Sequence, residues 1–359
     1  MTIHDAAPEQ PTSLPDLLKA RLPFLRRDTL QRVSDVVEAL IQAQSTCHRR
    51  LGTFLPSDVS PEARKKRLQR CFQDQQLTGE VFLDVLLPLL PPGKLVFAMD
   101  RTNWEHGTQP LNLLVLGVVL QGFTLPLVWE AIPHSGSSNT STRERLVARL
   151  LKRLPARRWK VLVADREFLG QQWFEFLRRR RIKRCIRVKG SARVDGDRLD
   201  EVYAGLPAGQ MVAMAEKEAI YGCRMQLVMA RSPEGDLMCL ATDLHVLDAM
   251  SAYKLRWSIE CTFSAMKSRG FNLEQTGITQ KERLERLFGL VTLAWTWSLR
   301  VGVDGALMRP IRVKSHGRKE ASLVTAGWER LACALRWGTS KRGPFTELFS
   351  SPFPASDAV

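Results

Sequence analysis

The sequence lacks the patterns that mark several common protein classes. Its seven cysteines are scattered and contain no Cys-x-x-Cys pair, which argues against a zinc site or a disulfide framework and fits a reducing cytoplasm. No glycine-rich loop ending in lysine is present, so we expect no nucleotide cofactor. The longest apolar stretch, residues 111–132, is interrupted by Gln121, Gly122 and Pro126. We therefore expect two buried strands there and no membrane span, and the polar N-terminus predicts no signal peptide.

Acidic residues are few relative to basic ones. Lysine and arginine number 53 against 37 aspartates and glutamates, a formal charge of +16. This excess favours a polyanionic partner, of which DNA is the commonest. Arginine-rich codon usage would produce the same balance, so charge alone leaves both explanations open. With 44% apolar residues, the 359-residue chain has enough material for a proper core and for two or three domains.

Two aspartates each end a short apolar run. Asp100 ends KLVFAMD and Asp165 ends WKVLVAD, and each run predicts a buried strand. Ligand and catalytic groups tend to lie just beyond the carboxyl ends of strands in such sheets. We therefore expect the two carboxylates to lie close together at one edge of a sheet.

A predicted helix over residues 248–268 carries a third acid within a polar stripe. Residues at spacings of three, four and seven share this stripe: Tyr253, Arg256, Glu260 and Lys267. A separate stripe is apolar and predicts the packing face: Leu255, Ile259, Phe263 and Met266. The carboxylates of Glu260 and the two aspartates are the ligands expected of a site for two Mg²⁺ or Mn²⁺ ions, roughly 4 Å apart. Three unrelated surface carboxylates are the alternative, and an Arg256–Glu260 ion pair would leave Tyr253 and Lys267 unexplained.

These residues resemble the DDE transposases of bacterial insertion sequences, specifically the insertion-sequence-four group. The pattern Tyr-x2-Arg-x3-Glu-x6-Lys of that group is matched at every position. Asp100 lies in MDRTNW and Asp165 in ADREFLG, similar to the two aspartate segments of the group. The resemblance covers roughly residues 94–300. It implies catalysis by Asp100, Asp165 and Glu260 with divalent metal, and binding of DNA phosphates by Tyr253, Arg256 and Lys267.

The expected fold class is α/β, with an all-helical N-terminal region. Periodicity predicts strands 94–100, 111–121 and 123–132, helix 141–154, strand 160–165, helix 169–181 and strand 182–188. This order is that of the ribonuclease-H-like fold, a name that comes from the resemblance. The expected segments are a helical domain (1–90), the first catalytic part (91–188), a β-rich insertion (189–246), the second catalytic part (247–305) and a C-terminal region (306–359). We expect the last to contribute to dimerisation and to end in a weakly ordered tail from Ser340.

Further basic residues are candidates for DNA contact. Arg166 directly follows the second aspartate. A dense run of cations begins at the end of the predicted helix 169–181 and continues beyond it: Arg178, Arg179, Arg180, Arg181, Lys183, Arg184, Arg187 and Lys189. A solvated helix end is the alternative for the run, but its charge exceeds that need. The loop 134–142 favours either a DNA contact or a helix N-cap at Thr140 or Ser141. The N-terminal helices predict either binding of DNA ends or a cap on the catalytic domain.

One apolar residue of the insertion is a candidate for base capture. Relatives that open a DNA hairpin hold a flipped base against a large apolar side chain, and resemblance of DLMCLATD to that strand places Met238 there. A core methionine is the alternative.

The resemblance implies a transposase that binds terminal inverted repeats, pairs two ends as a homodimer, cleaves each end and joins the 3′-hydroxyls to target DNA. A metal-dependent nuclease of the same fold and a non-catalytic DNA-binding protein are the alternatives.

Overall fold

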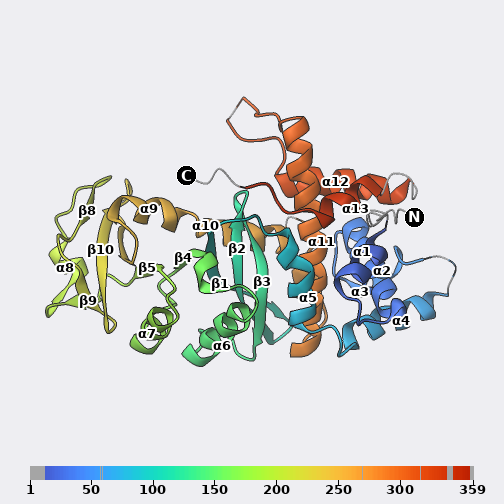
Figure 1. The fold of residues 1–359 in the computed structure, drawn as a ribbon, viewed down its shortest axis with the longest axis horizontal. Coiled ribbons are helices and arrows are strands. Elements are labelled where there is room, and N and C mark those ends of the chain that lie inside the picture. Colours follow the sequence, from blue (N-terminus) through green and yellow to red (C-terminus); the bar gives the residue numbers. More distant parts are fainter. Residues whose placement is uncertain are drawn as a thin grey trace, which may run out of the picture. The chain divides into compact units, whose positions relative to one another are not determined.

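The computed structural model describes residues 13–56, 58, 60–268, 270–315, 317–337 and 343–355 (Figure 1). The chain divides into two compact units. Unit 1 comprises Met1–Pro91, Glu105–Gln109 and Ser264–Ala355, and unit 2 comprises Pro92–Trp104, Pro110–Phe263 and Ser356–Val359. None of the helices in the described part of the chain has the length and apolarity that crossing a bilayer requires.

Unit 2 is built around one large mixed sheet. Its first strands are β1 (Leu95–His106), β2 (Gln109–Leu120), β3 (Phe123–Ile132), β4 (Trp159–Ala164) and β5 (Arg184–Val188). They lie in the order β3-β2-β1-β4-β5, with β2 and β3 antiparallel and with β1, β4 and β5 parallel to one another. A three-strand meander followed by two parallel strands is the ribonuclease-H-like arrangement, so the expected fold class is confirmed.

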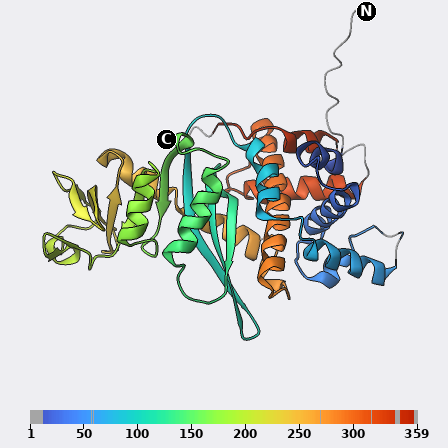
Figure 2. The ribbon, with the colours of Figure 1, turned by 60° about the horizontal axis from the view of Figure 1, so that its bottom comes forward.

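Helices cover both faces of this sheet. The helices α6 (Thr140–Leu151) and α7 (Gln171–Arg179) form the crossovers into β4 and β5, as parallel strands require. They lie together on one face (Figure 2). On the other side of the sheet run α9 (Val246–Lys254) and α10 (Trp257–Lys267).

The insertion extends the same sheet. Its strands are β6 (Arg193–Val194), β7 (Asp197–Arg198), β8 (Met211–Ala213), β9 (Glu218–Ile220), β10 (Cys223–Arg231) and β11 (Leu237–Thr242), with a short helix α8 (Leu199–Val202). β11 pairs antiparallel with β5, and β10 and β8 follow outward. The segment is thus β-rich and continuous with the sheet of unit 2.

Unit 1 is helical. Before the sheet come α1 (Leu14–Arg21), α2 (Arg27–Ala43), α3 (His48–Gly52), α4 (Pro61–Gln73) and α5 (Gly79–Leu86), and after it come α11 (Lys281–Met308), α12 (Leu323–Arg336) and α13 (Gly343–Ser350). The long α11 packs against α2, α5 and α12, and its Trp295 and Trp297 are buried, as core residues should be. Gly302 and Gly327 let α11 and α12 cross closely, since a Cβ on Gly302 would meet the Leu323 carbonyl oxygen at 1.8 Å.

Three sequence expectations need correction. Asp100 does not end its strand, because β1 continues to His106. The helix expected over 248–268 is two helices, α9 and α10, separated at Leu255 and Arg256. The tail is helical over α13 and buries Phe349. The tail residues 340–342 and 356–359, which were expected to be weakly ordered, lie outside the described residues, as do residues 1–12.

A buried hydroxyl network attaches the first part of α10 to strand β3. The Thr262 Oγ1 atom accepts a hydrogen bond from the Thr124 backbone N–H (2.8 Å) and donates to the Thr124 carbonyl oxygen (2.9 Å). The Thr124 hydroxyl also lies 2.6 Å from the Ser258 hydroxyl. Thr262 and Thr124 are fully buried. These bonds position the helix that carries Glu260.

We expect Thr262→Val to lower the free energy of unfolding by about 1–3 kcal/mol, because it leaves the buried Thr124 N–H without an acceptor. Thr296→Val is the matched control, since the Thr296 hydroxyl bonds only to the Thr292 carbonyl oxygen of its own helix. Urea titration of both variants measures the difference. Equal stabilities would show that the network does not hold α10.

Candidate active site

The register of two parallel strands brings the predicted aspartates together. β1 and β4 pair up to Met99 opposite Ala164, and the next residues of the two strands are Asp100 and Asp165. Both side chains therefore lie at the level where β4 ends, although β1 itself continues to His106.

The break between α9 and α10 places two further predicted residues. Arg256 N–H bonds to the Tyr253 carbonyl oxygen (2.9 Å) and Ile259 N–H to the Arg256 carbonyl oxygen (3.1 Å). These i→i−3 bonds tighten the chain into a turn between the helices. Tyr253 therefore ends one helix and Glu260 lies in the next, yet the Tyr253 hydroxyl still reaches Asp165 Oδ1 (3.2 Å).

Arg256 links the other two acids. Its Nη1 atom lies 3.3 Å from Asp100 Oδ2, and its Nη2 atom lies 2.5 Å from Glu260 Oε1. The Arg256 side chain is only 14% exposed, so these ion pairs are shielded from solvent more than surface pairs are. One guanidinium thus bridges a strand carboxylate and a helix carboxylate.

The donor set at this edge consists of oxygen atoms. Among the described residues, no three Asp, Glu, His or Cys side chains lie close enough to hold one ion. Arg256 lies between Asp100 and Glu260 and forms an ion pair with each. Carboxylate oxygens without sulfur or imidazole suit Mg²⁺ or Mn²⁺, so the residues fit such an ion by their chemistry.

Burial dominates the electrostatics of Asp100. It raises the pKa of the Asp100 carboxyl to about 6, and the negative charges of Asp165 and Glu167 act in the same direction. The Arg101 backbone N–H and the Arg256 guanidinium oppose this shift. Burial, with the charge of Asp165, also raises the pKa of the Tyr253 phenol to about 12, so Tyr253 remains a hydrogen-bond donor at neutral pH.

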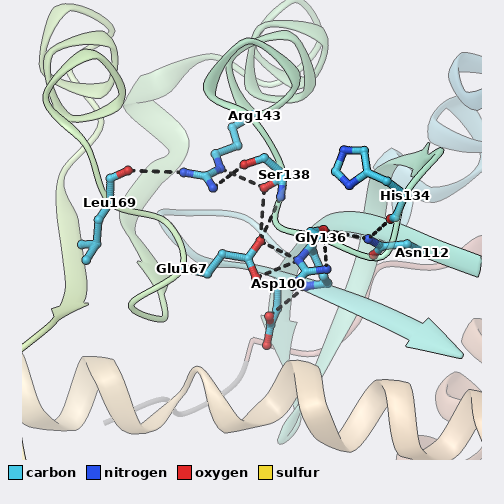
Figure 3. A network of polar contacts seen from close by, with 9 residues as sticks. Asp100, Asn112, His134, Gly136, Ser138, Arg143, Glu167 and Leu169 are labelled. Atoms are coloured by element: carbon cyan, nitrogen blue, oxygen red, sulfur yellow. Dashed lines mark hydrogen bonds and ion pairs between the residues drawn. The ribbon is translucent and has the colours of Figure 1, made fainter. Parts of the chain in front are cut away.

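A second polar network lies beside Asp100 and was missed by the sequence reasoning (Figure 3). Arg101 Nε contacts both oxygens of Glu167, at 2.6 and 2.7 Å. Arg101 follows the first aspartate and Glu167 lies two residues after the second, so this ion pair joins the two aspartate segments. The opposite charges next to the two aspartates were the available signal.

The loop 134–142 is attached to this network. Ser138 N–H and Oγ each lie 3.3 Å from Glu167 Oε1, and Arg101 Nη1 donates to the Gly136 carbonyl oxygen (3.0 Å). The N-cap of α6 is Asn139, whose side chain accepts from Thr142 N–H. The expected caps Thr140 and Ser141 are therefore wrong by one or two residues.

The other predicted cations fall into different environments. Six of the expected DNA contacts are exposed besides Arg166: Arg178, Arg179, Arg180, Arg181, Lys183 and Lys189. Arg187 is half-buried, and Lys267 forms an ion pair with Glu274 (3.0 Å) within unit 1. Met238 lies in β11, half-buried and opposite Ala230 of β10, and its role in base capture stays a prediction.

The prediction that Arg184 contacts DNA is wrong, because its side chain is buried. Its side chain is 3% exposed and binds Asp243 through Nε (2.7 Å) and Nη2 (2.9 Å). Its Nη1 atom donates to the Phe174 carbonyl oxygen (2.7 Å). A guanidinium held in this way is structural, because the buried Arg184 charge would lose both its half-buried carboxylate partner and a buried carbonyl. Arg184 is therefore withdrawn from the predicted DNA contacts.

Comparisons with known proteins bear on this geometry. The sequence matches the family described as "Transposase DDE domain" over residues 91–297, more than half of the chain. No curated protein matches the chain. Similar solved structures include the piggyBac transposase synaptic complex with hairpin DNA, at 11% identity over 96% of this chain and 84% of that one, with a TM-score of 0.46. Endonuclease V from Bacillus subtilis is similar at 14% identity over 52% and 84%, with a TM-score of 0.25. Neither TM-score is high enough to bear on function.

Asp100 predicts a pH-dependent stability. A carboxyl whose folded pKa is raised to about 6 favours folding when protonated, and this contribution is lost as the pH rises through 6. We therefore expect the difference in free energy of unfolding between Asp100→Asn and wild type to grow in favour of the variant as the pH rises from 4 to 7.5, by up to about 3 kcal/mol. Urea unfolding in EDTA measures this gain. Asp236→Asn, at an exposed carboxylate, is the control and should show no such change.

Proposed function

Because the chain belongs to the family of transposase DDE domains, we propose that it cleaves and joins DNA at the ends of a mobile element. It binds terminal inverted repeats, cuts the phosphodiester at each end and joins the freed 3′-hydroxyls to target DNA. The observation that supports this best is the meeting of Asp100 and Asp165 at one sheet edge, with Glu260 linked to Asp100 through Arg256. Membership in the insertion-sequence-four group, carried by the pattern around Glu260, is part of the proposal.

Asp100, Asp165 and Glu260 would hold the divalent metal in this proposal. When bound, Mg²⁺ or Mn²⁺ lowers the pKa of a nucleophilic water or 3′-hydroxyl and stabilises the leaving oxygen. Asp100 must be ionised to bind metal, and its raised pKa means that proton and metal compete for it below about pH 6. Cleavage and joining are both in-line displacements at phosphorus, so one site serves both steps.

Arg256 acts in two ways in this proposal. Without metal it neutralises Asp100 and Glu260, which would otherwise repel each other. In a DNA complex it would bind a phosphate, for which the planar guanidinium offers a bidentate fork. Tyr253 holds Asp165 through its hydroxyl and keeps that carboxylate aimed at the site. Lys267 and the exposed Arg166 are each proposed to contact a DNA phosphate.

The remaining assignments are proposals of the same kind. The N-terminal domain (1–90) binds the element ends, and Met238 is the candidate for base capture. The exposed cations at the end of α7 and beyond it contact the DNA backbone: Arg178, Arg179, Arg180, Arg181, Lys183 and Lys189. Two copies pair the ends in the DNA complex, and no nucleotide cofactor is required.

Cleavage of an end duplex in Mg²⁺ tests the carboxylate site. We expect wild type to cut at the element end and Glu260→Ala to lose at least about 10³-fold in rate, since the metal site loses a ligand. DNA binding in EDTA should stay within a few-fold of wild type, which separates catalysis from binding. Joining of a labelled 3′-hydroxyl end to a plasmid distinguishes a transposase from a nuclease. Failure of wild type to cut a correctly bound end would refute the enzymatic proposal.

The role of Arg256 predicts opposite effects on metal and on DNA. Arg256→Gln removes a cation that competes with the metal, so Mn²⁺ should bind the DNA-free protein about tenfold more tightly or better. Cleavage should fall, because a phosphate contact is lost. Electron paramagnetic resonance of free Mn²⁺ measures the affinity, and the control is Arg179→Gln, whose partner Glu175 lies on α7. Unchanged Mn²⁺ affinity in Arg256→Gln would contradict this role.

A further inference from the structure

A basic cleft lies at the end of the parallel strands opposite to the carboxylates. It has a volume of about 550 Å³ and is lined by five cations: Lys94, Arg157, Lys160, Arg181 and Lys183. Asp248 is the one acid in its lining. We call this hollow the amino-edge cleft, and all of its lining belongs to unit 2.

The strand directions fix its position. Lys94 directly precedes β1, Lys160 is the second residue of β4, and Lys183 directly precedes β5. Because these three strands are parallel, their amino ends share one edge of the sheet. Five or six residues separate this edge from Asp100 and Asp165, which is about 16–20 Å of strand. A phosphate in the cleft is therefore not the phosphate at the carboxylates.

The five cations of the cleft are not neutralised by ion pairs among the described residues. All five cations are exposed, and none takes part in an ion pair within the part of the chain that the structure describes. Their neighbours in sequence differ, since Arg179 pairs with Glu175 and Arg184 with Asp243. Five like charges around one hollow repel one another, and a polyanion relieves that repulsion.

Arg181 adds an independent observation. It has a left-handed backbone (φ 57°) at the end of α7, where Ile182 N–H bonds to the Leu177 carbonyl oxygen (3.0 Å). Glycine is the usual residue at this position of a helix end, because other side chains are strained there. A strained arginine where glycine would fit indicates that the guanidinium is needed for something other than the fold.

We propose that the amino-edge cleft binds the sugar–phosphate backbone of a second DNA segment, separate from the segment being cut. The proposal rests on DNA being the substrate, as in the proposed function. Lysine and arginine contacts to phosphates carry no sequence information, so the cleft should accept any sequence. One chain would then hold DNA at both ends of its parallel strands.

The salt dependence of DNA binding tests the cleft directly. In EDTA, the logarithm of the affinity of wild type for a short duplex of arbitrary sequence should fall steeply with the logarithm of salt concentration. In the triple variant Lys94→Gln/Arg157→Gln/Lys160→Gln this slope should be smaller by about 2.7, or 0.9 for each lost phosphate contact. Fluorescence anisotropy between about 50 and 200 mM salt covers the range in which the change is large.

A matched variant separates the cleft from overall charge. Lys152→Gln/Lys217→Gln/Arg224→Gln removes three exposed cations of unit 2 that lie outside the cleft. It should keep the wild-type slope. An equal loss of slope in both triple variants would overturn the proposal, because the effect would then follow net charge alone.

Arg181→Gly provides a second test, in which DNA binding should weaken although the stability of the protein is kept. Glycine relieves the left-handed strain, so the melting temperature should stay within about 3 °C of wild type. The slope for DNA binding should still fall by about 0.9. Retention of the full slope by a stable Arg181→Gly protein would count against the cleft.

The two proposals fail separately. The cleft triple variant should still cut a short end duplex at saturating protein concentration, whereas Glu260→Ala should not. Absence of cutting by wild type would remove the enzymatic proposal and leave the slope comparison valid. Equal slopes would remove the cleft and leave cutting unaffected.

Discussion

The parallel pairing of β1 with β4 is the interaction on which the candidate site depends. Five residue pairs join these strands, and the ring of Phe97 stacks on that of Trp159 with centroids 3.9 Å apart at the amino end of the ladder. Residues Phe97–Met99 and Val161–Ala164 are fully buried, so packing on both faces of the sheet holds the register. A slip of one residue would turn Asp165 to the opposite face from Asp100. Two acids far apart in the chain thus meet because apolar residues beneath them fit in one way.

Acidic and basic side chains gather at opposite ends of these parallel strands. At the carboxyl edge every acid has a partner: Arg256 for Asp100 and Glu260, Tyr253 for Asp165, and Arg101 for Glu167. Burial nevertheless keeps Asp100 harder to ionise than a free carboxyl, which leaves it responsive to a stronger cation. At the amino edge five cations gather with one acid. The sheet therefore separates an acidic end from a basic end within one unit.

Local pattern was sufficient for part of this arrangement and insufficient for the rest. The apolar runs before Asp100 and Asp165 correctly indicated two buried strands, because strand burial is written into consecutive residues. The continuation of β1 beyond Asp100 was missed; in the structure, buried Thr102 and Trp104 alternate there with the more exposed Arg101, Asn103 and Glu105. The turn between α9 and α10 was also missed, because apolar residues keep helical spacing through it.

The burial and partners of a charged side chain are harder to predict from sequence than the order of helices and strands. Within one basic run, Arg181 faces solvent and Arg184 is buried against Asp243, and no property of the letters separates them. The difference comes from a partner of Arg184 that lies 59 residues away in the chain. The Arg101–Glu167 pair was missed for a similar reason, because its partners are 66 residues apart and meet only when β1 and β4 pair. Long-range pairings of charge need the fold before they can be assigned.

The pairing of β11 with β5 has a consequence for the evolution of the chain. Without the segment 189–246, β5 would become the rim of the sheet and would expose the backbone groups that now bond to Cys239–Thr242. An uncovered rim that carries residues as apolar as Ile186 and Val188 invites pairing with another molecule. The present rim on this side consists of the three-residue strands β8 and β9, which are too short to act as a template. A shortened descendant could therefore not shed this segment without becoming prone to aggregate, which gives selection a reason to retain it that is independent of any DNA contact.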